Sequence, residues 1–88
     1  MDSPGSEITA FESLASELDP AQYATAIITG TVSCLRVTNR QAAQLTEDIY
    51  AGRGWYWWSW AERITGCDDV DGAAAKIAHV LRAAVPVA

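Results

Sequence analysis

The stretch from residue 54 to residue 64, GWYWWSWAERI, contains all four tryptophans of this 88-residue chain. Aromatic residues favour β-strands, and Gly52 and Gly54 supply turn chemistry just before the run. Residues 47–51, on the other side of this turn, alternate in polarity as a strand does. We therefore predict an antiparallel β-hairpin that pairs residues 47–51 with residues 55–60.

The alternation of side chains along a strand divides the aromatic run between two faces. The even-numbered residues from 56 to 60 point to one face, and the odd-numbered residues from 55 to 59 point to the other. If helices cover one face, the second set of side chains lacks a covering element. Two readings stay open: loops or helices cover both faces, or the second face is an interface, because Trp, Tyr and Arg dominate interface hot spots.

A helix is predicted upstream of the hairpin, over residues 7–18, after a loose N-terminus at residues 1–5. Apolar residues recur there at helical spacing, namely Ile8, Phe11, Leu14, Ala15 and Leu18. Ser6 is a suitable cap for its start, and Asp19-Pro20 ends it.

Residues 21–38 are rich in β-branched side chains, which favour strands. We predict two strands, over 22–29 and 33–38, joined near Gly30. An alternative stays open for the first of them. Asp19 could cap a second helix that begins at Pro20 and closes at Gly30.

The remaining segments are predicted as follows. Thr38-Asn39 would cap a short helix over residues 40–45, and residues 65–68 would form a loop. Ile64 would continue the second strand of the hairpin or end it at a bulge.

A final helix is indicated by apolar residues at helical spacing, namely Ala73, Ala74, Ile77, Val80, Leu81 and Ala84. Asp69 or Asp71 would cap it and Pro86 would end it. The fold class that follows is α+β: an antiparallel sheet of about four strands, with the N- and C-terminal helices packed on one face. The whole chain, residues 1–88, is predicted to be one domain.

Charge argues against some classes of partner. The net charge is −5, and the five acids of the first 19 residues precede the first base, Arg36. An acidic chain without a basic stripe lacks the footprint of a nucleic-acid-binding protein. No apolar segment is long enough to span a membrane, and MDSPGSE is unlike a secretory signal. We therefore predict a cytoplasmic protein that binds neither nucleic acid nor membrane.

Candidate catalytic and metal-binding residues are few. Cys34 and Cys67 lie too far apart for a metal motif and are predicted to be reduced thiols. His79 falls near the polar side of its helix, without a partner to orient it. The run CDDVDG resembles a calcium loop, but the alignment places Cys67 and Ala78 where oxygen ligands are needed. We predict no enzyme activity, no metal and no cofactor.

Four segments, LRVTN, EDIYA, WYWWSWAERI and VLRA, together resemble a group of small uncharacterised proteins found in actinobacteria. The resemblance covers roughly residues 20–84. It implies a cytoplasmic bacterial protein that works beside regulatory proteins, and it implies no activity.

The function predicted from the sequence is a protein–protein interaction through the tryptophan hairpin, either as a homodimer or with a regulatory partner. Trp55, Trp57 and Tyr50 would form the interface, with Arg53 and Arg63 at its rim. The alternative is a small-molecule module, for a carbohydrate for example, with aromatic walls and Glu62 or Arg63 as the polar contact.

Overall fold

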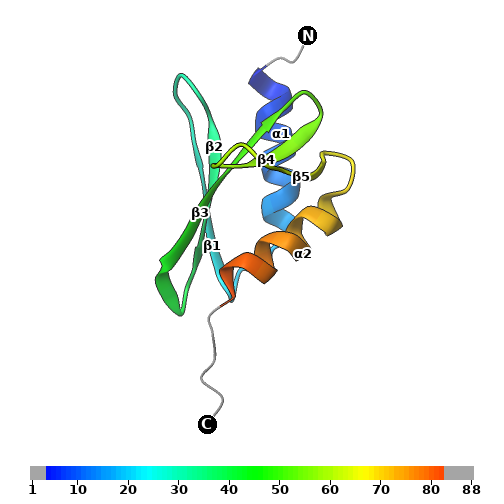
Figure 1. Cartoon of the computed structure of the whole chain (residues 1–88). Coiled ribbons are helices and arrows are strands. Elements are labelled where there is room, and N and C mark those ends of the chain that lie inside the picture. The colour runs from blue at the N-terminus through cyan, green and yellow to red at the C-terminus, as the bar shows by residue number, and fades with distance from the viewer. Residues whose placement is uncertain (1–3, 83–88) are drawn as a thin grey trace.

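Two helices and five strands make up the computed structural model, which describes residues 4–82 (Figure 1). In chain order they are α1 (Pro4–Glu17), β1 (Tyr23–Ile28), β2 (Cys34–Asn39), β3 (Ala42–Gly52), β4 (Trp55–Trp58), β5 (Arg63–Gly66) and α2 (Val70–Leu81). The α+β class and the two strands predicted over 22–29 and 33–38 are confirmed. The first helix begins earlier than predicted, at Pro4.

The five strands form an antiparallel sheet in the order β1-β2-β3-β4-β5, so each strand pairs with its neighbour in sequence. The prediction of about four strands missed β5. Ile64 does not continue the hairpin strand but lies in β5, and residues 65 and 66 belong to this strand instead of a loop.

The predicted helix over residues 40–45 is wrong, because β3 begins at Ala42. Asn39 does cap the chain there, but it caps a turn: its Oδ1 accepts a hydrogen bond of 2.8 Å from the backbone N–H of Gln41. Its Nδ2 donates to the carbonyl oxygen of Leu81 at 2.7 Å. The turn therefore reverses the chain directly from β2 into β3 and ties this end of the sheet to the end of α2.

The tryptophan hairpin is confirmed, with Tyr50 opposite Trp57 and Gly52 opposite Trp55. Arg53 and Gly54 form its two-residue turn, with φ angles of 56° and 77°. Positive φ at both positions is typical of the turn that suits the twist of a β-hairpin.

The second strand of the hairpin is shorter than predicted, because β4 ends at Trp58. The N–H of Ala61 donates to the carbonyl of Trp58 at 3.0 Å, and Ala61 adopts a left-handed φ of 66°. This tight turn sends the chain back as β5, so the alternation between faces stops before Trp60.

Both helices lie on the same face of the sheet, as predicted, and they also contact each other (Figure 1). The core lies between the helices and this face. Its largest fully buried side chains come from every layer: Phe11, Leu14, Leu35, Ile49, Tyr56, Ile77 and Leu81. Tyr56 also links the layers, since its hydroxyl donates to the carbonyl of Ala10 in α1 at 2.7 Å.

The last helix is capped by Asp69, whose side chain accepts from the N–H of Gly72 at 3.0 Å. Ala73, Ala74 and Ile77 are buried as predicted, whereas Val80 is 42 % exposed. The predicted roles of Ala84 and Pro86 lie outside the described residues.

Because of Tyr56, the stability of the folded chain is expected to fall at high pH. Burial, with a smaller effect of nearby Cys67, raises the pKa of Tyr56 from 10.0 to about 12. Because the folded chain keeps the phenol protonated longer, this contribution is full below pH 10 and is lost as the pH rises toward 12. Tyr56→Phe should lower the melting temperature below pH 10 and flatten the further decline above it. Tyr50→Phe is the control, and an equal flattening in that variant would contradict the assignment to Tyr56.

Candidate functional site

The face of the sheet opposite the helices, called the outer face below, is covered by no other element of residues 4–82 (Figure 1). The pairing register places four of the five predicted interface residues on it. Tyr50 is opposite Trp57, Trp57 is opposite Arg63, and Trp55 is two residues from Trp57 on the same strand. The structure therefore brings these residues together as one surface.

Trp55 and Arg63 form a cation–π contact on the outer face. The Arg63 guanidinium carbon lies 4.6 Å from the centroid of the Trp55 ring, and Trp55 is 38 % exposed. A guanidinium stacked on an indole combines apolar area with charge, as interface hot spots do. Arg53, the fifth predicted residue, is exposed in the turn of the hairpin, at the end of this surface.

Trp57 is half-buried and held in place by a hydrogen bond. Its Nε1 donates to the carbonyl of Gly52 at 3.0 Å, across the hairpin from its own strand. The bond satisfies the indole N–H without a partner molecule. The ring can therefore enter a dry interface without leaving a polar group unpaired.

An apolar row crosses the outer face from β1 to β4. Ile28 of β1 is opposite Cys34 of β2. Cys34 lies beside Tyr50 of β3, because the neighbouring residues Leu35 and Ile49 are paired. Tyr50 in turn is opposite Trp57 of β4. Ile28 and Tyr50 are half-buried and Cys34 is buried. The sequence could not show that Ile28 and Cys34 extend the tryptophan surface, because their place depends on the register of three strands.

The charges beside this row neutralise each other. Nε of Arg36 donates to Oδ1 of Asp48 at 2.9 Å, and Nη2 donates to Oδ2 at 3.2 Å. The hydrogen bond to Asp48 raises the pKa of Arg36, and burial raises the pKa of the Cys34 thiol. The thiol within the row is therefore protonated, and the arginine beside the row is paired with an acid.

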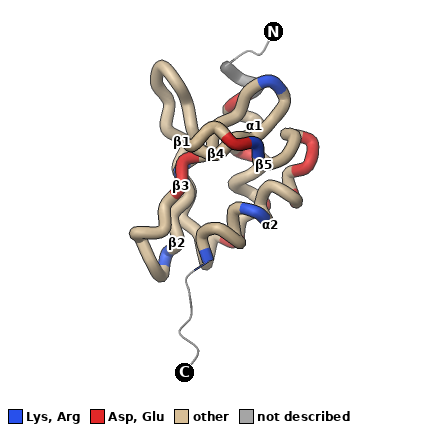
Figure 2. Tube along the Cα trace, viewed as in Figure 1, with Lys and Arg blue, Asp and Glu red and all other residues tan. Residues whose placement is uncertain are grey.

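Acidic positions lie along the helix side of the molecule, and also on β3 and in the turn after β4 (Figure 2). Glu12 and Glu17 are exposed on α1, and Asp71 is exposed on α2. The pKa of Glu17 is raised because its carboxyl group shares a hydrogen bond with Asp71, which also repels its negative charge. These three exposed acids of α1 and α2 lie on the side of the sheet away from the outer face, where the acid beside Arg36 is paired.

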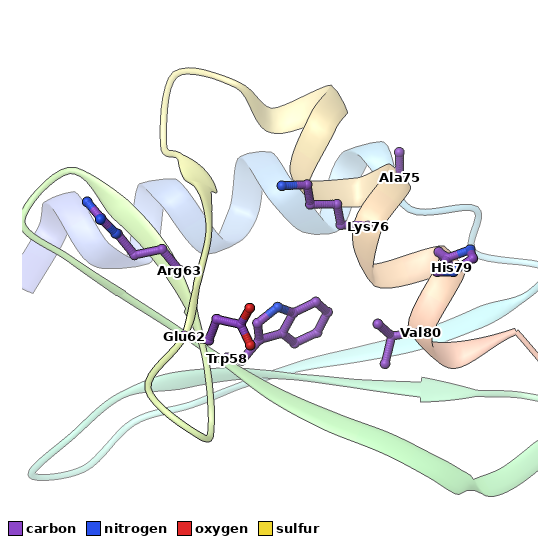
Figure 3. A pocket seen from close by; sticks show the side chains of 7 residues that line it. All are labelled: Trp58, Glu62, Arg63, Ala75, Lys76, His79 and Val80. Carbon is purple, nitrogen blue, oxygen red and sulfur yellow. The ribbon is translucent and has the colours of Figure 1, made fainter.

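A groove of about 370 Å³ opens on the helix side, between α2 and the end of the hairpin (Figure 3). The indole of Trp58 lies between Glu62 and Val80, and the Arg63 side chain points away from the groove. Lys76 uses its Nζ to donate to the carbonyl of Ile64 at 2.9 Å.

Trp60 forms a second aromatic feature, at the edge of this groove. Its ring stacks on Trp58 with a centroid separation of 4.9 Å and an interplanar angle of 6°. Its Nε1 donates to Oε2 of Glu62 at 2.8 Å. Trp60 is 50 % exposed, because the turn after β4 removes it from the core face that the alternation predicted.

Candidate catalytic groups stay apart. His79 is exposed on α2, as the helical periodicity predicts, while Cys34 lies on the outer face, on the other side of the sheet. Cys34 and Cys67 form no disulfide. Residues 4–82 contain no group of three His, Cys, Asp or Glu side chains that could hold a metal ion. None of the helices in this range is long and apolar enough to cross a membrane.

Comparison with known proteins returned no matching family model, no similar curated protein and no similar solved structure. The resemblance to small actinobacterial proteins, and the cytoplasmic location that it implies, therefore stay predictions.

Proposed function

We propose that this protein is a non-enzymatic interaction module whose outer face binds the outer face of a second copy of the chain. The observation that carries the proposal is the aromatic surface of Tyr50, Trp55 and Trp57, which the helices leave uncovered. Soluble chains rarely leave such a surface open. Two antiparallel sheets that pack face to face bury their side chains in a layer about 10 Å thick.

Charge favours a second copy as the occupant. The outer face carries the paired Arg36 and Asp48 and the stacked Arg63. The exposed acids of α1 and α2 lie on the opposite side of each chain. Face-to-face association therefore keeps the two acidic sides far apart, so the repulsion between two chains of charge −5 is weakest in this arrangement.

Trp55 and Trp57 are the residues that should anchor the interface. Both side chains lie outside the buried core cluster, so the double variant Trp55→Ala/Trp57→Ala should fold. It should raise the dissociation constant at least about tenfold, because central aromatic residues supply most of the free energy of binding. Light scattering after size-exclusion chromatography should show that the molar mass is halved.

Trp60→Ala is the matched control, since Trp60 is the more exposed tryptophan but stacks on Trp58 and not on the outer face. Its molar mass should equal that of the wild type. An unfolded double variant would assign Trp55 and Trp57 to the core. Equal masses for the double variant and the wild type would contradict the proposed interface. In that case a different protein partner is the remaining candidate for the aromatic face.

The groove beside Trp58 supports a second candidate function, the binding of a small molecule such as a carbohydrate. Its concave shape between hairpin and helix favours this function. It ranks second because Glu62 and Lys76 already use hydrogen-bonding atoms within the chain. A sugar bound there should change the tryptophan fluorescence of the wild type but less that of Trp60→Ala. Unchanged emission across a series of sugars would reject a carbohydrate site.

A further inference from the structure

The two edges of the sheet differ in how their backbone groups are satisfied. The edge at β5 is closed by hydrogen bonds within the chain. The carbonyl of Ile64 accepts from Nζ of Lys76 at 2.9 Å. The carbonyl of Gly66 accepts from the N–H of Asp69 and from the Thr65 hydroxyl, both at 3.0 Å. β5 is also short and its register is shifted by a bulge, so another strand cannot readily pair with it.

Beyond Tyr23, the edge at β1 has none of these protections. No strand within residues 4–82 pairs with its free side. Its sequence, YATAII, has no charge, no proline and no glycine, and its pairing with β2 is regular from Tyr23 to Ile28. Charged residues, proline and bulges are the usual means of keeping an edge strand from pairing with another chain.

The hydrogen-bond alternation identifies which backbone groups of β1 are free. The N–H of Arg40 donates to the carbonyl of Gln22 at 2.9 Å, which makes this pair a hydrogen-bonded one. In an antiparallel ladder such pairs alternate, so Ala24 and Ala26 face β2 as well. The N–H and carbonyl groups of Thr25 and Ile27 then point outward. The backbone groups of Tyr23 also point to this side, but the N–H of Tyr23 already donates to the carbonyl of Asp19 at 2.9 Å.

We propose that β1 pairs antiparallel with β1 of a second copy, with Ala26 on the twofold axis. Thr25 of each chain then exchanges two hydrogen bonds with Ile27 of the other, so four intermolecular bonds form and the outward N–H and carbonyl groups of both residues are used. Ala26 meets its own copy in a non-hydrogen-bonded pair, where side chains approach most closely. Alanine is small enough to allow this approach, and Ala26 is exposed in the single chain.

A second copy fits this edge better than a strand of another protein. The same two residues donate and accept in both chains, as a twofold interface requires. Because the β5 edge is closed, the pairing stops at two chains and gives one sheet of ten strands, five from each copy. The backbone edge of β1 points along the plane of the sheet and the outer face points away from that plane, so both contacts can form at once, with Ala26 and Ile28 contributing their side chains to the outer face. Together they would give an assembly of four chains with two kinds of twofold interface.

Thr25→Pro is the first test. The variant lacks the outward N–H, and so two of the four intermolecular bonds, but keeps the ladder to β2, since proline is tolerated where the N–H of an edge strand faces solvent. The dissociation constant of the β1 contact should rise at least about tenfold. Light scattering should show half the wild-type molar mass, and circular dichroism should show a folded chain.

Ala26→Glu is the second variant, chosen so that the test survives if proline disturbs the fold. In the single chain the new carboxylate lies opposite Arg36, a favourable cross-strand pair. Across the twofold axis two carboxylates would meet and block the pairing. Ala21→Glu, at an exposed residue before β1, adds the same charge and should leave the molar mass unchanged.

The results separate this contact from the proposed outer-face interface. Each of Thr25→Pro and Trp55→Ala/Trp57→Ala should halve the mass alone, and the combination should give single chains. If folded Ala26→Glu keeps the wild-type mass, the β1 contact is refuted, whatever the tryptophan variant does. If only the tryptophan variant keeps the wild-type mass, the outer-face interface is refuted and the β1 contact is supported.

Discussion

Replacing Trp58 with alanine is expected to lower the free energy of unfolding by about 3–5 kcal/mol, the usual effect of removing a large aromatic side chain from a core. Trp58 is 7 % exposed and belongs to the core cluster. Its strand pairs it with Ile49, which is fully buried. A chain of this size has a total stability of roughly 4–13 kcal/mol. Much of the Trp58→Ala protein should therefore be unfolded under mild denaturing conditions.

The control for this prediction is Trp60→Ala, because the alternation along the sequence places residues 58 and 60 on the same face. In the structure Trp60 is 50 % exposed and contributes a stacking contact with Trp58, so its loss should lower stability by about 1 kcal/mol. Urea unfolding of both variants at one protein concentration gives the comparison. Equal losses of stability would show that both rings lie in the core. That result would contradict the turn after β4 that places Trp60 at the surface.

Asn39→Ala is expected to lower the free energy of unfolding by about 2–3 kcal/mol, because it removes one buried and one partly buried hydrogen bond and leaves a buried carbonyl without its donor. Asn39 is 7 % exposed. Its Nδ2 donates to the carbonyl of Leu81 in the last turn of α2, and its Oδ1 accepts from Gln41. One side chain therefore joins the β2–β3 turn to the C-terminal helix.

Asn39→Asp separates the two bonds. The carboxylate can still accept from the N–H of Gln41, but it cannot donate to the carbonyl of Leu81 and would face it with a negative charge. Thermal unfolding at pH 7 should show a loss at least as large as that of Asn39→Ala. Near-native stability of the aspartate variant would mean that only the turn matters and that the contact with α2 does not stabilise the fold.

Local patterns in the sequence were enough to predict the elements whose signals agree with their surroundings. Gly52 and Gly54 between two strand-like runs identified the hairpin, and β-branched residues identified β1 and β2. Residues 40–45 were predicted wrongly because Asn39 can cap either a helix or a turn. Pairing of β3 with β2 decides between the two, and this is a tertiary contact that no local pattern contains.

The candidate site was predictable in part for the same reason. Alternation along one strand places Trp55 and Trp57 on a common face, and the hairpin register adds Tyr50. The contributions of Ile28 and Cys34 depend on the order of strands across the sheet. The stacking of Trp60 on Trp58 depends on a left-handed residue, Ala61, that no sequence signal marked.

The molar mass of the unmodified protein in solution, measured over a range of concentrations, tests the central claim most directly. Association through the outer face requires more than one chain. With the β1 contact formed as well, the expected mass is four times that of the 9.5 kDa chain. Twice the chain mass would mean that only one of the two contacts forms, and the tryptophan and Thr25 variants would then show which one. A mass of 9.5 kDa at every concentration would contradict self-association through either surface.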